Sequence, residues 1–147
     1  MKPVKDVLQE KGNDIWSIDP EASVFEAIDL MAQKEVGALL VLKNEKLIGI
    51  ISERDYTRKV ILKGRESRKT QIKSIMTSPV ICTDADQDVR RCMAMMTSKG
   101  IRHLPVLEED QLVGVVSLGD LVKVIIAEQD MKIQGFERYF RYRSDLL

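Results

Sequence analysis

Apolar residues change from a strand-like to a helical spacing, and then back to a strand-like one, along the first part of the chain. Residues 15–18 predict a short strand. The next stretch has apolar residues at i, i+3, i+4 and i+7, which predicts an amphipathic helix of about three turns; these are Val24, Ala27, Ile28 and Met31. Ser23 and Glu26 stand three residues apart at the start of this helix, in the pattern of a capping box.

Two apolar runs follow, at 38–42 and 47–52, and they are rich in residues that favour β-structure. They predict a β-hairpin because the polar residues 43–46 separate them. Their near-continuous apolar character predicts helices on both faces of the sheet. A second helix is expected from about Glu53 to Lys63.

The same order of elements occurs twice in the chain. When residues 15–62 are shifted by 65 positions, they lie over residues 80–127 without a gap. One supersecondary unit is therefore used twice. The second copy predicts a helix capped by Asp88, strands at 104–107 and 112–117, and a final helix from about Leu118 to beyond Ala127.

This repeat defines the expected domain organisation. We divide the chain into a first repeat (1–63), a polar linker (64–70), a second repeat (71–130) and a tail (131–147). Similar lead-in segments, 4–8 and 72–76, precede the two copies. Neither repeat is long enough to cover an apolar sheet face by itself, so the two are expected to pack against each other.

Each copy ends in an apolar strand that contains a glycine and then enters Ser-x-x-Asp. The serines are Ser52 and Ser117, and the aspartates are Asp55 and Asp120. A strand that stops at a serine leaves unpaired backbone N–H groups at the start of the next helix, where an anion or polar ligand can bind. A carboxylate can also accept both hydroxyls of a vicinal diol. The same pattern equally describes a helix cap that has no ligand.

The two strand glycines, Gly49 and Gly114, are expected to allow close approach of a ligand or of another backbone.

Composition narrows the function classes. The 23 basic and 23 acidic residues cancel, which gives no support for nucleic-acid binding. No apolar run approaches the roughly 20 residues of a membrane span, and the polar N-terminus has no signal-peptide pattern, so a cytoplasmic protein without membrane contact is expected. Two cysteines, Cys82 and Cys92, are too few for a disulfide framework, and no metal site is expected. Cys92 falls on the apolar side of a helical pattern and is expected to be an ordinary core thiol. No nucleophile–base pair is visible, so no enzyme activity is expected.

The duplicated β-α-β-β-α pattern, with both Ser-x-x-Asp endings, resembles a pair of cystathionine-β-synthase-type (CBS) domains. The resemblance covers about residues 1–130. It implies an α/β (α+β) fold in which two repeats pack sheet to sheet about a pseudo-twofold axis. It also implies a regulatory module whose clefts bind adenine nucleotides.

The resemblance implies a role for each matching residue. Ribose would be bound by Asp55, Asp120, Ser52 and Ser117, and phosphate by Arg102, His103, Leu118 and Gly119. Adenine or backbone contacts would come from Trp16, Ser17, Val36, Gly37, Ala38, Ile81, Thr83, Ile101 and Pro105. Arg54, Arg58 and Lys59, at the start of the first motif's helix, are further phosphate candidates.

The two candidate sites carry different residues at matching positions. The first has Gly37-Ala38 where the second has Arg102-His103. We therefore expect one site for a mononucleotide and one for a larger adenine dinucleotide, with AMP and NAD as the leading ligands. S-adenosyl methionine, ATP and cyclic dinucleotides are open alternatives. So are an interaction module without a nucleotide, a nucleic-acid-associated regulator, and an enzyme that turns over a bound nucleotide.

The tail carries four of the seven aromatic residues of the chain: Phe136, Tyr139, Phe140 and Tyr142. An exposed aromatic stretch of this kind is expected to cover a surface of its own domain or of a partner subunit. CBS pairs often form homodimers, which favours a partner subunit as that surface. An unidentified regulated protein is the second expected partner.

Overall fold

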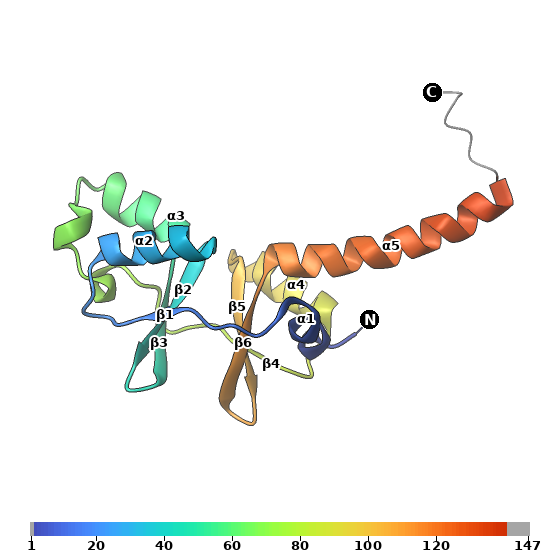
Figure 1. Ribbon diagram of the computed structural model, residues 1–147, viewed down its shortest axis with the longest axis horizontal. Helices are drawn as coiled ribbons and strands as arrows, with labels where there is room; N and C mark the ends of the chain where they lie inside the picture. Colours follow the sequence, from blue (N-terminus) through green and yellow to red (C-terminus); the bar gives the residue numbers. More distant parts are fainter. Residues whose placement is uncertain (1, 141–147) are drawn as a thin grey trace. The chain divides into compact units, whose positions relative to one another are not determined.

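The computed structural model describes the backbone of residues 2–140 and the side chains of residues 2–132 (Figure 1). The chain divides into two compact units. The Asp55 unit comprises residues 14–82, and the Asp120 unit comprises the residues up to Asn13 together with those from Thr83 onward. Each unit contains one three-stranded sheet, which confirms the expected mixed α/β class.

The Asp55 unit follows the predicted order closely. It contains β1 (Ser17–Ile18), α2 (Val24–Lys34), β2 (Ala38–Lys43), β3 (Lys46–Ser52), α3 (Glu53–Tyr56) and the short turns η1 (Thr57–Ile61), η2 (Ser67–Lys69) and η3 (Ile72–Ser74). Strand β2 is central, parallel to β1 and antiparallel to β3. The capping box of Ser23 and Glu26 is present at the start of α2. The predicted helix after β3 differs in one respect, since its second half, η1, is π-helical.

The Asp120 unit repeats this arrangement. It contains α1 (Val4–Lys11), β4 (Thr83–Asp84), α4 (Val89–Lys99), β5 (His103–Glu108), β6 (Gln111–Ser117) and α5 (Leu118–Phe140). Its sheet order is β4-β5-β6, with the same parallel and antiparallel pairings. Asp88 caps α4 by accepting a hydrogen bond from the backbone N–H of Arg90, as predicted.

Both hairpins close with two residues rather than the four polar residues that separate the apolar runs. Asn44 and Glu45 have positive φ angles of 51° and 64°, and Glu109 and Asp110 have angles of 50° and 63°. Two successive residues with positive φ form the tight turn that matches the twist of a hairpin. The strands consequently extend into the polar segment at both hairpins.

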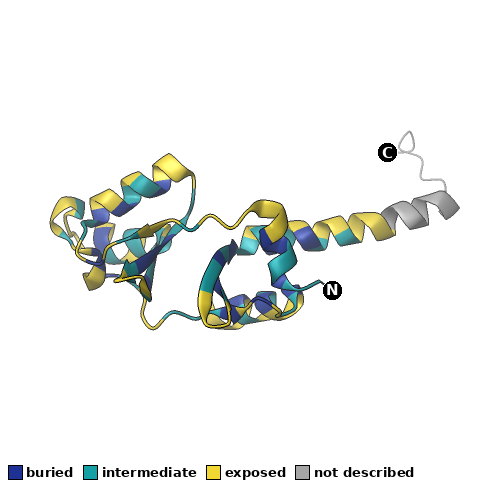
Figure 2. Cartoon of the chain, turned by 60° about the horizontal axis from the view of Figure 1, so that its bottom comes forward, coloured by how far each residue is buried: buried dark blue, intermediate teal, exposed yellow. Residues whose placement is uncertain are grey.

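The core of the Asp55 unit lies between its helices and one face of its sheet (Figure 2). It is formed by Val24, Ala27, Met31, Leu39, Val41, Ile51, Val60, Ile72 and Ile75. Leu40, which alternates with Leu39 and Val41 along β2, is also buried. Both faces of this strand are therefore covered, in agreement with its continuous apolar sequence.

Each lead-in segment packs in a different unit from the repeat that it precedes in the sequence. Helix α1 precedes the first repeat in sequence but packs in the Asp120 unit, where Val4 and Lys5 donate backbone hydrogen bonds to Gln87 and Ala85. Residues 72–76 precede the second repeat but pack in the Asp55 unit, where Ile72 N–H donates to the Ala22 carbonyl. Each compact unit therefore contains the lead-in that belongs to the other sequence repeat.

The strand glycines accommodate these lead-ins. A Cβ atom at Gly114 would lie 2.7 Å from Cδ2 of Leu8, and one at Gly49 would collide with Sδ of Met76. The close approach predicted at both glycines is therefore made by an apolar side chain, and the interpretation that a ligand or another backbone makes it is wrong.

Candidate functional site

The first candidate site lies where β3 ends and α3 begins in the Asp55 unit. Ser52 Oγ accepts a hydrogen bond from the Asp55 backbone N–H at 3.3 Å, and Asp55 Oδ2 accepts one from the Ser52 backbone N–H at 2.9 Å. This is a capping box, so Ser-x-x-Asp has the structural role that the sequence left open. The junction also fixes the Asp55 carboxylate at the end of the sheet.

The carboxylate of Asp55 has donors on both oxygens. Ser52 Oγ also donates to Oδ2 at 3.1 Å, while Lys59 Nζ lies 3.0 Å and Thr77 Oγ1 3.5 Å from Oδ1. Lys59 donates in addition to the Ile75 carbonyl at 2.8 Å. Lys59 thus ties the aspartate to the lead-in segment of this unit.

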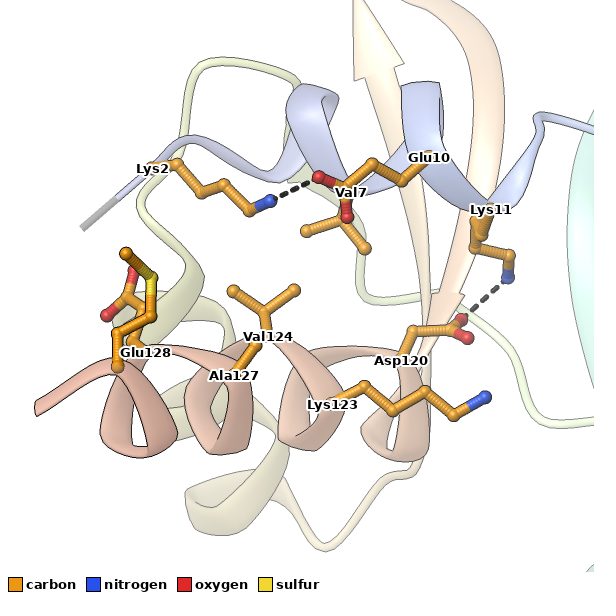
Figure 3. Close-up of a pocket in the computed structure, with 10 residues that line it drawn as sticks. Lys2, Val7, Glu10, Lys11, Asp120, Lys123, Val124, Ala127 and Glu128 are labelled. Atoms are coloured by element: carbon orange, nitrogen blue, oxygen red, sulfur yellow. Dashed lines mark hydrogen bonds and ion pairs between the residues drawn. The ribbon is translucent and has the colours of Figure 1, made fainter. Parts of the chain in front are cut away.

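The second candidate site, at the junction of β6 and α5, repeats the capping box. Asp120 N–H donates to Ser117 Oγ at 3.1 Å, and Ser117 N–H donates to Asp120 Oδ2 at 2.8 Å. The cation here is Lys11, from the last turn of α1, with its Nζ 2.6 Å from Oδ2 (Figure 3). Lys11 also donates to the Val115 carbonyl at 2.9 Å.

The charges at the second site are set by burial and by these bonds. Burial raises the pKa of Asp120, but the hydrogen bonds from Lys11 and Ser117 outweigh it and hold this pKa below its usual value. Burial lowers the pKa of His103; the Asp120 carboxylate opposes this effect, while Lys11 and Arg102 add to it. At neutral pH the site therefore presents an anionic carboxylate beside a neutral imidazole.

The residues at the start of β2 and β5, and those just before them, lie at the same junctions. The Gly37 carbonyl accepts from Glu53 N–H at 3.1 Å, and the Arg102 carbonyl accepts from Leu118 N–H at 2.8 Å. Ala38 is paired with Ser52, and His103 with Ser117. The structure therefore brings Gly37 and Ala38 to the first site, and Arg102, His103 and Leu118 to the second.

The remaining predicted residues have varied surroundings. Ser17 lies in β1 and pairs with Leu40 of β2. The centre of the Trp16 ring lies 4.3 Å from Lys34 Nζ. Val36 packs against the core of the Asp55 unit. Ile81 is partly buried in the Asp55 unit, Pro105 is buried in β5, and Ile101 N–H donates to the Met96 carbonyl. Arg54 belongs to α3, Arg58 is exposed on η1, and Gly119 is exposed in α5.

Thr83 is turned toward the interior of the Asp120 unit. Its side chain is buried, with Oγ1 3.7 Å from the sulfur of Cys92. Burial raises the pKa of the Cys92 thiol, which keeps it protonated at neutral pH. Cys92 is therefore a core thiol, as expected from its helical position.

A groove of about 440 Å³ runs between α1 and α5 beside the second site (Figure 3). Asp120, Lys11 and Lys123 lie toward one end, and Val7, Val124 and Ala127 line its middle. Its other lining residues are Lys2, Glu10, Glu128 and Met131.

The role of Lys11 as the cation beside Asp120 was not predicted from the sequence. This lysine is 109 positions from Asp120 and lies outside the aligned part of the repeat. The similarity of the lead-ins was the only signal that α1 belongs to a repeated unit, and it carries no information about the lysine that follows.

Within the part of the chain that the structure describes, no three His, Cys, Asp or Glu residues are grouped so as to hold a metal ion. Among the same residues, no helix is both long enough and apolar enough to cross a membrane. The side chains of Phe136, Tyr139, Phe140 and Tyr142, on which the predicted role of the tail depends, lie outside the described residues.

Comparisons with known proteins agree with this architecture. A family model of the CBS domain matches the chain twice, at residues 4–61 and 72–127. The CBS domain-containing protein CBSX3 of Arabidopsis thaliana, a mitochondrial protein, is 36% identical over an alignment of 148 positions, gaps included, which covers 94% of this chain and 71% of the relative. A solved CBS-domain protein from Burkholderia ambifaria is 43% identical, with a TM-score of 0.84 over 87% of this chain and 96% of that chain.

A further solved structure carries ligands. The CBS domain pair of protein MJ0100, in complex with 5′-methylthioadenosine and S-adenosyl-L-methionine, is 25% identical, with a TM-score of 0.77. The match covers 87% of this chain and 98% of that chain.

Proposed function

This chain belongs to the CBS-domain family, and from that membership we propose that it is a regulatory module that binds adenosine-containing ligands at its two Ser-x-x-Asp junctions. The bound ligand is recovered unchanged, since the module senses it and does not catalyse a reaction. Binding changes the conformation or the assembly of the protein, and another protein responds to that change.

The observation that carries this proposal is the Asp120 carboxylate. Its side chain is only 16% exposed. Lys11, Arg102 and His103 lie around it. A fixed carboxylate suits the two hydroxyls of a ribose, and the two cations, together with the N–H of the neutral imidazole, suit a phosphate. The adenosine ligands of the MJ0100 pair support the same chemical class.

We propose that the Asp55 junction is a second and weaker site. Its carboxylate already has four donor contacts, from Ser52 N–H, Ser52 Oγ, Lys59 and Thr77. A ribose must displace some of these contacts before it can bind. AMP is the proposed ligand of one site and NAD that of the other, with unequal affinities.

We propose a homodimer as the assembled state. Ile126 and Met131 on α5 are 53% and 75% exposed, and Figure 2 shows burial declining along this helix. An exposed apolar helix surface is typical of a protein–protein contact. A regulated protein is the second proposed partner.

One observation favours a different function. Both aspartates complete capping boxes, which explains Ser-x-x-Asp without any ligand. The alternative is therefore an interaction module in which the junctions are purely structural.

A thermal-shift panel separates the two functions. AMP, NAD, S-adenosyl methionine, 5′-methylthioadenosine and ATP are tested on the wild type, and the dissociation constant of each active ligand is measured by isothermal titration. The variant Asp120→Asn keeps an oxygen for the Ser117 N–H but loses the charge. Asp88→Asn, which alters the cap of α4 in the same unit, is the matched control.

Binding that weakens in Asp120→Asn and persists in Asp88→Asn supports the nucleotide module. If none of the five compounds stabilises the wild type, the interaction module is the better account.

A further inference from the structure

We propose that Lys11 is a latch on the Asp120 site: the ribose of a ligand competes with Lys11 for one carboxylate, so that binding releases the last turn of α1. This inference rests on the proposed function and concerns the regulation of the same site. It makes α1 the element that first responds to the ligand.

The competition follows from the donors already bound to Asp120. The Ser117 N–H and Lys11 Nζ both bond to Oδ2, at 2.8 and 2.6 Å. Because a carboxylate oxygen has two lone pairs, two donors occupy Oδ2. A diol that binds both oxygens must therefore displace one of them.

Lys11 is the donor that can leave. The Ser117 N–H is part of the backbone and is held by the turn from β6 into α5, whereas Lys11 is a flexible side chain that is 36% exposed. Moving the lysine exchanges one bond to a charged group for bonds from the diol. Moving the backbone donor would break the cap of α5.

Helix α1 is anchored so that only its end can respond. Val4, Val7 and Leu8 are buried, Leu8 packs on Gly114, and Lys5 forms an ion pair with Asp86 at 2.7 Å. The last turn, residues 9–11, is exposed. Lys11 bonds there to Asp120 and to the Val115 carbonyl, so its release loosens this turn while the rest of α1 stays in place.

The released turn is joined directly to the other unit. Residues 12–16 have no regular secondary structure and lead from α1 into β1 of the Asp55 unit. A change at Lys11 therefore alters the start of the connection between the units. The lysine at the Asp55 site cannot act in this way, because Lys59 lies four residues from Asp55 on the same helical segment.

The test uses 5′-methylthioadenosine as the probe, because it has a ribose diol but no phosphate that Lys11 could attract. Its dissociation constant is measured by isothermal titration for the wild type, Lys11→Met, Lys123→Met and Asp120→Asn. Lys123 lines the same groove and serves as the matched control. Thermal melting checks that each variant is folded.

The latch predicts that Lys11→Met binds the probe about three- to fivefold more tightly than the wild type, since a partly exposed ion pair no longer has to be broken. The dissociation constant of Lys123→Met for the probe should stay within about twofold of the wild-type value. In hydrogen exchange, the probe should accelerate the amides of residues 9–12 in the wild type.

Two other results overturn the latch in distinguishable ways. If binding depends on Asp120 but Lys11→Met is unchanged or weaker, the latch is wrong and the proposed function stands. If neither the wild type nor Lys11→Met binds the probe or AMP, the proposed function and the latch are both wrong.

Discussion

The two Ser-x-x-Asp junctions have the same capping hydrogen bonds but different charge partners. In the Asp55 unit the cation is Lys59, one helical turn beyond the aspartate, and in the Asp120 unit it is Lys11, from the far end of the sequence. Duplication therefore reproduced the capping box without reproducing the ion pair. Lys59 links its site to residues 72–76 of the same unit, whereas Lys11 links its site to the helix that leads into the other unit.

The two units also differ in the lead-in side chain that packs against the strand glycine. Met76 is partly exposed and packs on Gly49, whereas Leu8 is buried and packs on Gly114. Methionine adapts to an irregular space more easily than leucine does. Leu8 can therefore move aside from Gly114 less easily than Met76 can from Gly49.

The largest expected effect on stability comes from filling these glycine positions. Gly114→Ala should lower the free energy of unfolding by about 1–3 kcal/mol, because the new methyl group overpacks against Leu8. Gly49→Ala should cost less, since Met76 can rotate away. Urea denaturation of both variants measures the difference.

A variant with Leu8→Ala added to Gly114→Ala provides the control. The two changes should be less destabilising together than the sum of the single changes, because the clash is removed. Strict additivity would contradict the contact.

The next effect concerns ligand affinity. Asp120→Asn should weaken binding of AMP at the stronger site about ten- to a hundredfold, because hydrogen bonds to a charged acceptor are lost. Asp55→Asn should leave that site unchanged and affect only a weaker one. Isothermal titration of both variants gives the affinities, and equal losses in the two variants would remove the distinction between the sites.

A smaller effect is expected from the capping serines. Ser117→Ala should destabilise the protein by about 1 kcal/mol, the usual cost of a lost helix cap. Ser52→Ala should have a similar cost, because the side chains of both serines also bond to the aspartates of their capping boxes. Chemical denaturation with Ser23→Ala as the reference cap measures both, and no loss of stability in Ser117→Ala or Ser52→Ala would contradict the capping role.

The smallest expected effect is on the pH dependence of stability, and it arises in the Asp120 unit. Burial lowers the pKa of His103, so the unfolded chain takes up a proton more readily as the pH falls below about 6.5. The stability contribution of the neutral imidazole is complete above that pH and is lost as the pH falls through the lowered pKa of the folded state. His103→Gln should show a weaker decline in melting temperature over this range.

The matching position of the Asp55 unit is Ala38, which does not titrate, so Ala38→Gln is the control substitution. This substitution should leave the decline in melting temperature at low pH unchanged. A decline that is identical in wild type and His103→Gln would contradict this assignment.

Much of the fold was predictable from the sequence because it depends on local patterns. The capping box of Ser23, the cap at Asp88 and both hairpins follow from neighbouring residues, and the structure confirms them. The fold class followed from the repetition of these patterns. The π-helical turn after α3 has no local signal of this kind.

The site was only partly predictable because its charge partners are distant in sequence. Asp120 and His103 could be named from the repeat, but the contact of Lys11 with Asp120 depends on where α1 packs. The role of the strand glycines was misread for the same reason, since Leu8 and Met76 reach them from other segments. Local patterns fixed each junction, and tertiary packing supplied what surrounds it.

A crystal structure of the protein grown with AMP would show directly whether Asp120 binds a ribose. We expect both ribose hydroxyls within hydrogen-bonding distance of the Asp120 carboxylate, with Lys11 Nζ moved away from Oδ2. A ribose that faces away from both Asp120 and Asp55, or an empty site with the Lys11 contact still at 2.6 Å, would contradict this expectation.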